Sequence, residues 1–324
     1  MSASPISAAL SPTAKPGFES GSFERVTHVD FFIDLVIIGL SVGMVYALVA
    51  LGISLIYSGL DIVHFAHGEI YMIGAFIGLT LFQKTGLPYV PVLLLAVILT
   101  GFIGILIERV FYRRLTSQGG GYTVAGMGMV IVGFGMSIVL QNVAFLIWGP
   151  KPFPFPVPFG RPLEVGNLAL PMSYVWIVVT ALVLMLVLNL VLKKTMLGLA
   201  IRAVAHNKDI AYLSGVNVPL MISAIFGIAC ALGAAAGVLI APINYVQVQM
   251  GIGVLIKAFA AAIVGGFGSL PGAVLGGLMV GVTESLGAGF ISGTYKDIYA
   301  FILLILVLMV KPSGILGVAA KVKA

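Results

Sequence analysis

His64, His67 and Glu69 are the residues of this chain whose types and spacing could do chemistry. The two histidines lie one helical turn apart if the helix is intact, and the carboxylate follows closely. Imidazole and carboxylate groups in this arrangement could bind a metal ion or relay a proton. The spacing is not the His-Glu-x-x-His of membrane metalloproteases. We therefore favour hydrogen bonds from these side chains to nearby backbone, with no metal site predicted.

The same stretch predicts a break in a helix at membrane depth. Long apolar runs flank it, although only 9% of the chain is charged. Ionisable groups inside a membrane are costly and usually face a bundle interior or a wet path. Gly59, Gly68 and Gly74 weaken the helix at the same place. A polar, glycine-bearing segment of this kind is typical of the discontinuous helices that transporters use near the bilayer midplane.

Glu69 needs a partner, because a buried lone carboxylate is unfavourable. Lys257 is the only charged residue between Gly251 and Leu270, so we hypothesise an ion pair between Glu69 and Lys257. The alternative is that the lysine extends its ammonium group to the membrane interface.

A glycine-rich turn follows, comprising Gly265, Gly266, Gly268 and Ser269 before Pro271. Such residues end one helix and begin another. The free N–H groups of a helix that begins near Pro271 would favour an anion, whereas an ordinary tight turn accounts for the same residues. The chain contains no Gly-Lys-Ser or Gly-Lys-Thr, so it cannot hydrolyse ATP through a P-loop.

The elements that must position these residues are apolar helices. Hydrophobic residues make up 60% of the 324 residues, and the mean hydropathy is +1.16. These values exclude a soluble globular protein, and long continuous runs argue against a membrane β-barrel. The apolar runs are 33–57, 65–83, 89–111, 125–148, 172–192, 219–242, 252–270, 272–290 and 297–311. We predict an all-α polytopic membrane protein with eight or nine spanning segments, of which 65–83, 252–270 and 272–290 are short or interrupted and could re-enter.

Basic residues cluster at the ends of apolar runs, near Arg113, near Lys193 and Arg202, and near Lys311. This distribution follows the positive-inside rule, so the net charge of +6 does not indicate nucleic-acid binding. Nine crossings with a cytoplasmic C-terminus place all three clusters on one side. The proline-rich loop 149–159 then lies outside, as a stiff connector or a docking surface.

We predict three parts of the chain: a disordered tail over residues 1–30, a membrane domain over 31–318, and a short tail over 319–324. The tail at 1–30 lacks the basic start and apolar middle of a signal peptide. Within the membrane domain, the cytoplasmic loop 193–218 contains a short amphipathic helix that Gly215 is expected to close. That helix could lie on lipid headgroups or dock on a partner protein.

A weak internal repeat links the two halves. The small-residue run Gly39–Gly52 precedes the histidine segment, and a similar run, Gly227–Gly237, precedes the segment that begins at Gly251. Paired interrupted segments are the best sequence indication of an inverted-repeat transporter.

Over residues 35–317 the chain resembles the inner-membrane permease subunits, closest to the H-type, of bacterial branched-chain amino acid ABC transporters. The matching runs include Tyr46-Ala-Leu, Phe65-Ala-His-Gly-Glu69, Ile107-Glu-Arg-Val110, Arg202-Ala203, Leu213-Ser-Gly-Val-Asn217, Lys257-Ala-Phe259, Gly265-Gly-Phe-Gly-Ser-Leu-Pro-Gly-Ala273 and Pro312-Ser-Gly-Ile-Leu-Gly317. His64 stands where the family commonly has Asn, and the N-terminal tail is longer than usual.

The resemblance implies a non-enzymatic transport subunit that forms a path for leucine, isoleucine and valine across the bacterial inner membrane. Its implied partners are a second related permease subunit, two ABC ATPase subunits that use ATP, and a periplasmic substrate-binding protein, with no cofactor on this chain. The residues expected along the path are Tyr46, His64, Phe65, His67, Gly68, Glu69, Lys257, Gly265, Gly266, Gly268 and Ser269, and those expected to couple to the ATPases are Arg202, Ala203, Gly215 and Asn217.

Three alternatives stay open at this point. Related permeases for urea and short amides share the Ala-His-Gly-Glu run. An ion-coupled secondary transporter would need no ATPase, and an intramembrane metalloenzyme would use the two histidines and Glu69.

Overall fold

The computed structural model describes residues 28–116, 122–156, 159–165 and 168–317. In chain order the elements are α1 (His28–Leu60), α2 (His67–Thr85), α3 (Tyr89–Ile107), the π-helical segment η1 (Glu108–Tyr112), α4 (Arg113–Thr116), α5 (Tyr122–Trp148), β1 (Leu163–Val165), β2 (Leu168–Leu170), α6 (Met172–Lys194), α7 (Met196–His206), α8 (Lys208–Leu213), α9 (Val218–Ile240), α10 (Met250–Gly265), α11 (Leu270–Phe290), the 3-10 turn η2 (Gly293–Tyr295) and α12 (Lys296–Val310).

The predicted all-α membrane fold is confirmed, with one small antiparallel hairpin, β1–β2, as its β structure within the described residues. Each of the nine predicted apolar runs has its helix. Seven helices in the described residues are long and apolar enough to cross a membrane, and α2 and α10 are not among them. The run 272–290 therefore forms a helix, α11, that is long and apolar enough to span. The runs 65–83 and 252–270 form α2 and α10, which do not meet these two criteria together.

The first helix begins at His28, so residues 28–30 belong to α1 rather than to the predicted tail. The remainder of that tail and residues 319–324 lie outside the described residues.

Small residues let the central helices approach closely. A Cβ atom on Gly43 of α1 would lie 2.9 Å from the carbonyl oxygen of Gly277 on α11, and one on Gly39 would lie 2.8 Å from Cα of Val282. Without a hydrophobic drive between helices in lipid, such close backbone contacts are what hold a membrane bundle together. Glycine therefore sets how closely α1 and α11 approach at this crossing.

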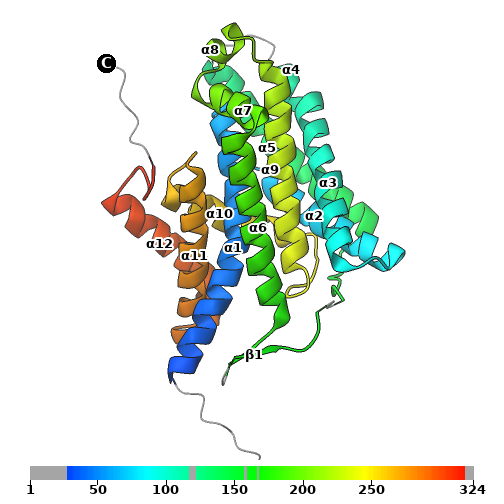
Figure 1. The fold of residues 1–324 in the computed structure, drawn as a ribbon, viewed down its shortest axis with the longest axis vertical. Coiled ribbons are helices and arrows are strands. Elements are labelled where there is room, and N and C mark those ends of the chain that lie inside the picture. The colour runs from blue at the N-terminus through cyan, green and yellow to red at the C-terminus, as the bar shows by residue number, and fades with distance from the viewer. Residues whose placement is uncertain (1–27, 117–121, 157–158, 166–167, 318–324) are drawn as a thin grey trace, which may run out of the picture.

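The helices α1, α9 and α2 form the interior of the bundle. Their side chains supply most of the largest fully buried residues, including Phe76, Phe226 and Tyr71. The faces of α3, α5, α6 and α12 carry most of the exposed apolar side chains, as expected for surfaces that meet lipid or another membrane subunit. Figure 1 shows α4, α7 and α8 at one end of the bundle and the hairpin strand β1 at the other.

The proline-rich loop 149–159 is partly pinned to the helices. The backbone of Phe153 exchanges hydrogen bonds with Val246 at 2.9 Å, and Phe155 is buried against Phe82 and Tyr89. These contacts favour the interpretation of this loop as a connector.

Candidate functional site

The break predicted from the histidine segment is present. The helix α1 ends at Leu60, residues 61–66 are not helical, and α2 begins at His67. Asp61 takes the left-handed conformation, with φ of 57°, which is uncommon outside glycine and marks a sharp change of direction. The N–H groups of Glu69 and Ile70 both bond the carbonyl of Ala66, which starts the new helix. We call residues 61–66 the helix-break loop.

The two interrupted helices meet at their N-termini. A Cβ atom on Gly251, in the first turn of α10, would lie 2.6 Å from the carbonyl oxygen of Gly68, and one on Gly68 would lie 2.5 Å from that of Gly251. The structure thus juxtaposes the two segments that the sequence paired. Two helix N-termini that face each other inside a bundle are the arrangement expected at a transporter midplane. The inverted-repeat relationship itself stays a prediction.

The polar side chains of α2 are buried where the two helices meet. His67 is fully buried beside Gly52 and Gly233, and neither of its ring nitrogens has a hydrogen-bond partner among the described residues. Glu69 is 3% exposed, and its Oε1 accepts a hydrogen bond of 3.2 Å from Ser137 of α5. Its Oε2 has no partner in the described part of the chain. Buried polar atoms without partners usually mark water or functional sites.

The prediction that His64, His67 and Glu69 bond nearby backbone is wrong, because Glu69 accepts from a serine hydroxyl and His67 has no side-chain partner among the described residues. His64 has a partner on another helix. Its Nδ1 lies 2.7 Å from the hydroxyl oxygen of Tyr112, the last residue of η1. Next to it in the helix-break loop, Phe65 stacks on Phe134 of α5, with ring centroids 4.1 Å apart. The loop is therefore held by side chains on both of its flanks.

The hypothesis that Glu69 pairs with Lys257 is wrong, because Lys257 is paired with other carboxylates. The ammonium Nζ of Lys257 lies 2.6 Å from Glu284 Oε1 and 2.8 Å from Asp297 Oδ1. Lys257 lies six residues after Gly251, so the two residues point in directions that differ by roughly 240° around the axis of α10. Lys257 therefore faces α11 and α12, while Gly251 faces Glu69.

Tyr46 belongs to this lysine network and not to the histidine segment. Its hydroxyl donates to Glu284 Oε2 at 2.8 Å and lies 3.3 Å from the Lys257 ammonium. The network joins α1, α10, α11 and α12. Glu284 was missed in the sequence, although it is the only charged residue of the apolar run 272–290 and so carried the same signal as Lys257.

The glycine-rich turn is a capped connection between α10 and α11. Ser269 accepts a hydrogen bond from the Gly272 N–H at 3.2 Å, and Gly266 and Gly268 have φ of 110° and 82°. The chain after α12 covers this turn, because the N–H of Leu316 bonds the carbonyl of Gly265. At about 1.5 Å per residue, the turn lies roughly 20 Å along α10 from Gly251. A path that includes both the turn and Glu69 has to follow the length of α10.

The loop 193–218 contains two short helices, α7 and α8. The side chains of Thr195 and Asn207 cap their N-termini, and Asn217 caps α9 by accepting from the Leu220 N–H at 3.1 Å. The C-cap of α8 is Ser214, and Gly215 follows it in the left-handed conformation with φ of 82°, so the glycine lies one residue beyond its predicted position as C-cap. Arg202 is exposed on α7, and Ala203 is partly buried against the core.

Together α7 and α8 present a patch of exposed apolar side chains, which we call the end patch. Its members are Met196, Leu199, Ile210, Tyr212 and Leu213, with exposed fractions from 55% to 84%. Lys193 and Lys194 lie next to it in the chain, so the patch sits beside a basic cluster at one end of the bundle (Figure 1). Exposed apolar side chains that gather at one end of a molecule are typical of a surface that contacts a protein or a membrane.

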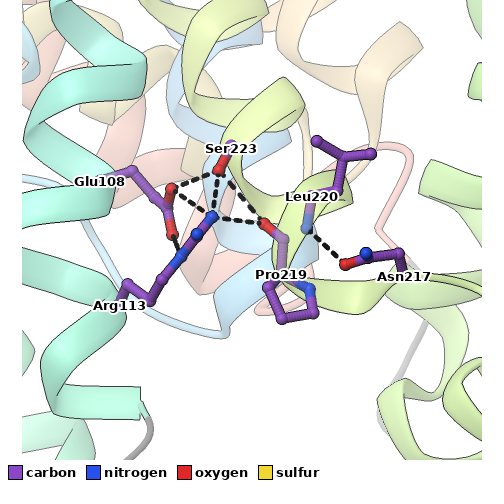
Figure 2. Close-up of polar contacts among 6 residues, drawn as sticks. All are labelled: Glu108, Arg113, Asn217, Pro219, Leu220 and Ser223. Carbon is purple, nitrogen blue, oxygen red and sulfur yellow. Dashed lines mark hydrogen bonds and ion pairs between the residues drawn. The ribbon is translucent and has the colours of Figure 1, made fainter.

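A buried carboxylate close to this loop was not identified from the sequence as a site residue. Figure 2 shows Glu108 of η1 with Arg113, Ser223 and the carbonyl of Pro219. Arg113 donates to both carboxylate oxygens, at 3.4 and 3.3 Å, to Ser223 at 2.7 Å, and to Pro219 at 3.1 Å. Ser223 also donates to Glu108. The sequence feature that could have indicated this buried carboxylate is the charged pair Glu108-Arg109 at the end of an apolar run.

A matching family model and two similar relatives belong to one family. The family model described as branched-chain amino acid transport system / permease component matches residues 35–308. The high-affinity branched-chain amino acid transport system permease protein BraD of Pseudomonas aeruginosa is 42% identical over 86% of this chain and 94% of its own. LivH of Escherichia coli, a permease protein of the same description, is 34% identical over 89% and 96%. The solved structure of PsaBC from Streptococcus pneumoniae in complex with Fab aligns with a TM-score of 0.47 at 14% identity, over 88% of this chain and 97% of that one.

Proposed function

Since this chain belongs to the family of branched-chain amino acid transport permeases, we propose that it is the membrane permease subunit of an ATP-driven importer of leucine, isoleucine and valine. The chain itself would not be an enzyme. The observation that supports the ATP-driven part of the proposal is the end patch, because exposed apolar side chains at one end of the bundle offer a contact surface for an ATPase subunit.

The end patch faces the cytoplasm in this proposal. The positive-inside rule assigns Lys193, Lys194 and Arg113 to the inner side, and the end patch lies at that end of the bundle. The C-terminus follows Lys311 and is proposed to lie on the same side. The protein would therefore be a multi-pass protein of the bacterial inner membrane.

The proposed partners divide the work of transport. Two ABC ATPase subunits would bind ATP and dock on the end patch, with Arg202, Ala203, Gly215 and Asn217 in the coupling segment. A second related permease subunit would complete the path, and a periplasmic binding protein would deliver the amino acid. No cofactor is assigned to this chain.

The path is proposed to pass the place where α2 and α10 meet. Glu69 and His67 carry buried polar atoms that have no partner among the described residues. The helix-break loop can change shape because its backbone is not helical. Separation of Gly68 from Gly251 would open the space between α2 and α10, and renewed contact between them would close it.

Reconstitution of the complex tests this function. The tagged chain is purified from its native membranes with the proteins that remain bound, placed in liposomes, and supplied with ATP and labelled leucine or urea. We expect two ATPases in the preparation and ATP-dependent uptake of leucine. Uptake of urea instead would keep the architecture and change the substrate, whereas uptake by this chain alone, driven by an ion gradient, would overturn the ATP-driven mechanism.

A further inference from the structure

The π-helical segment η1 connects two parts of the molecule that the proposed mechanism must link. A π turn carries one extra residue per turn and is frequent at functional sites. Here the N–H of Arg113 bonds the carbonyl of Glu108, five residues earlier. This geometry lets Arg113 lie over Glu108 and form the two hydrogen bonds drawn in Figure 2.

One end of η1 is fastened to the start of α9. Glu108 is 2% exposed, and both Ser223 and Arg113 donate to it. Arg113 also donates to the carbonyl of Pro219, in the first turn of α9. Loss of Arg113 would leave the buried carboxylate without its cation, and loss of Ser223 would remove one of its hydrogen bonds, so both contacts link η1 to α9. Since Asn217 caps α9 directly after α8, these contacts hold the helix that receives the coupling segment.

The other end of η1 contacts the helix-break loop. The Tyr112 hydroxyl lies 2.7 Å from His64 Nδ1. Phe226, one helical turn beyond Ser223 on α9, packs against both rings, at centroid distances of 5.1 Å from Tyr112 and 5.3 Å from His64. The three rings join α9, η1 and the loop in one buried cluster.

The aromatic cluster is tightly packed against α5. A Cβ atom on Gly133 of α5 would lie 3.2 Å from the Tyr112 hydroxyl oxygen and 3.4 Å from the backbone nitrogen of Phe65. Packed interiors pass displacements on because they do not compress. A second, exposed contact reaches the other end of the loop, where Lys208 of α8 pairs with Asp61 at 3.2 Å.

We propose that Tyr112 and His64 are positioning residues that pass movement of the coupling segment to the helix-break loop, and through it to Glu69. This inference rests on the proposed function. Movement of α7 and α8 shifts the first turns of α9, the Glu108–Arg113 tie carries η1 along, and the Tyr112–His64 hydrogen bond moves the loop that precedes α2.

The test measures how many leucine molecules are transported per ATP hydrolysed by the complete complex in liposomes. Tyr112→Phe removes only the hydroxyl. We expect the ratio to fall about fivefold, the worth of one buried hydrogen bond, while the complex still assembles and hydrolyses ATP. Tyr89→Phe is the matched control, because the Tyr89 hydroxyl is also buried and donates to Val238 at 2.9 Å, but at the opposite end of α3.

The histidine side gives an independent readout. An asparagine oxygen occupies nearly the position of His Nδ1 and accepts from a tyrosine hydroxyl. His64→Asn should therefore keep the ratio of leucine transported to ATP hydrolysed, whereas His64→Ala should lower it as Tyr112→Phe does. The double variant that combines His64→Ala with Tyr112→Phe should lower the ratio no further than either single variant. Equal ratios for Tyr112→Phe and wild type, or additive losses in the combined variant, overturn the inference. Failure of the wild-type complex to transport leucine with ATP would instead overturn the proposed function.

Discussion

At the residue scale, the Lys257 network shows what a buried charge needs. Two carboxylates and a tyrosine hydroxyl surround one ammonium group, and Lys257 and Glu284 are both less than 10% exposed. The attraction between buried charges offsets the cost of desolvation only when the partners are all present. These contacts join α10 to α11 and α12.

Lys257→Met should therefore destabilise the protein by about 3–5 kcal/mol, because it leaves Glu284 buried without its cation. The double variant Lys257→Met with Glu284→Gln should recover much of this loss. Thermal unfolding of the purified chain in detergent measures both. A single variant as stable as wild type would contradict the network, and Lys296→Met, at an exposed lysine of α12, is the control.

The residue scale is also where the sequence was least informative. The types of Glu69 and Lys257 indicated buried charges that need partners, and both are buried. Which partner each one takes depends on the rotation of α10 and on the placement of α11, and neither is encoded in the local sequence. The hydrogen bond between His64 and Tyr112 joins residues 48 positions apart and has no local signal either.

At the element scale, the helices were predictable because apolar length and glycine position act locally. The break between Leu60 and His67 and the turn after Gly265 fall where the sequence placed its glycines and ionisable residues. The π turn η1 was not predictable, because the local sequence carries no signal for it and the contacts of Glu108 reach residues of α9 more than 100 positions away.

The crossing of α1 and α11 gives an element-scale prediction. A methyl group on Gly43 would meet the backbone of Gly277 and Leu278 at 2.9 and 3.0 Å, and backbone cannot rotate away as a side chain can. Gly43→Ala should force the helices apart and cost about 1–3 kcal/mol in stability. Gly135→Ala in α5 is the control, since nothing lies within 4 Å of its Cβ position. Equal melting temperatures for the two variants would argue against a glycine-fixed crossing.

At the scale of the whole molecule, the bundle has two different kinds of exposed apolar surface. The faces of α5 and α12 belong to membrane-spanning helices, so exposed leucine and isoleucine side chains there need no further explanation. The end patch on α7 and α8 is different, because these helices are too short to span and lie at the end of the bundle beside charged residues. Apolar side chains in that position are stable only when a partner or the membrane surface covers them.

A charged substitution in the end patch tests whether a partner protein or the membrane surface covers these side chains. Leu213 is 83% exposed, so Leu213→Asp should leave the fold intact while placing a carboxylate in any apolar contact with an ATPase. We expect the variant to enter the membrane in normal amounts and to retain less than a tenth of the ATPase subunits in a pull-down, because an interface charge without a partner costs several kcal/mol. Glu164→Lys, on the hairpin at the opposite end, should retain them all. If Leu213→Asp bound the ATPases as wild type does, the end patch would instead rest on lipid headgroups, and the docking surface would have to lie elsewhere on the cytoplasmic end.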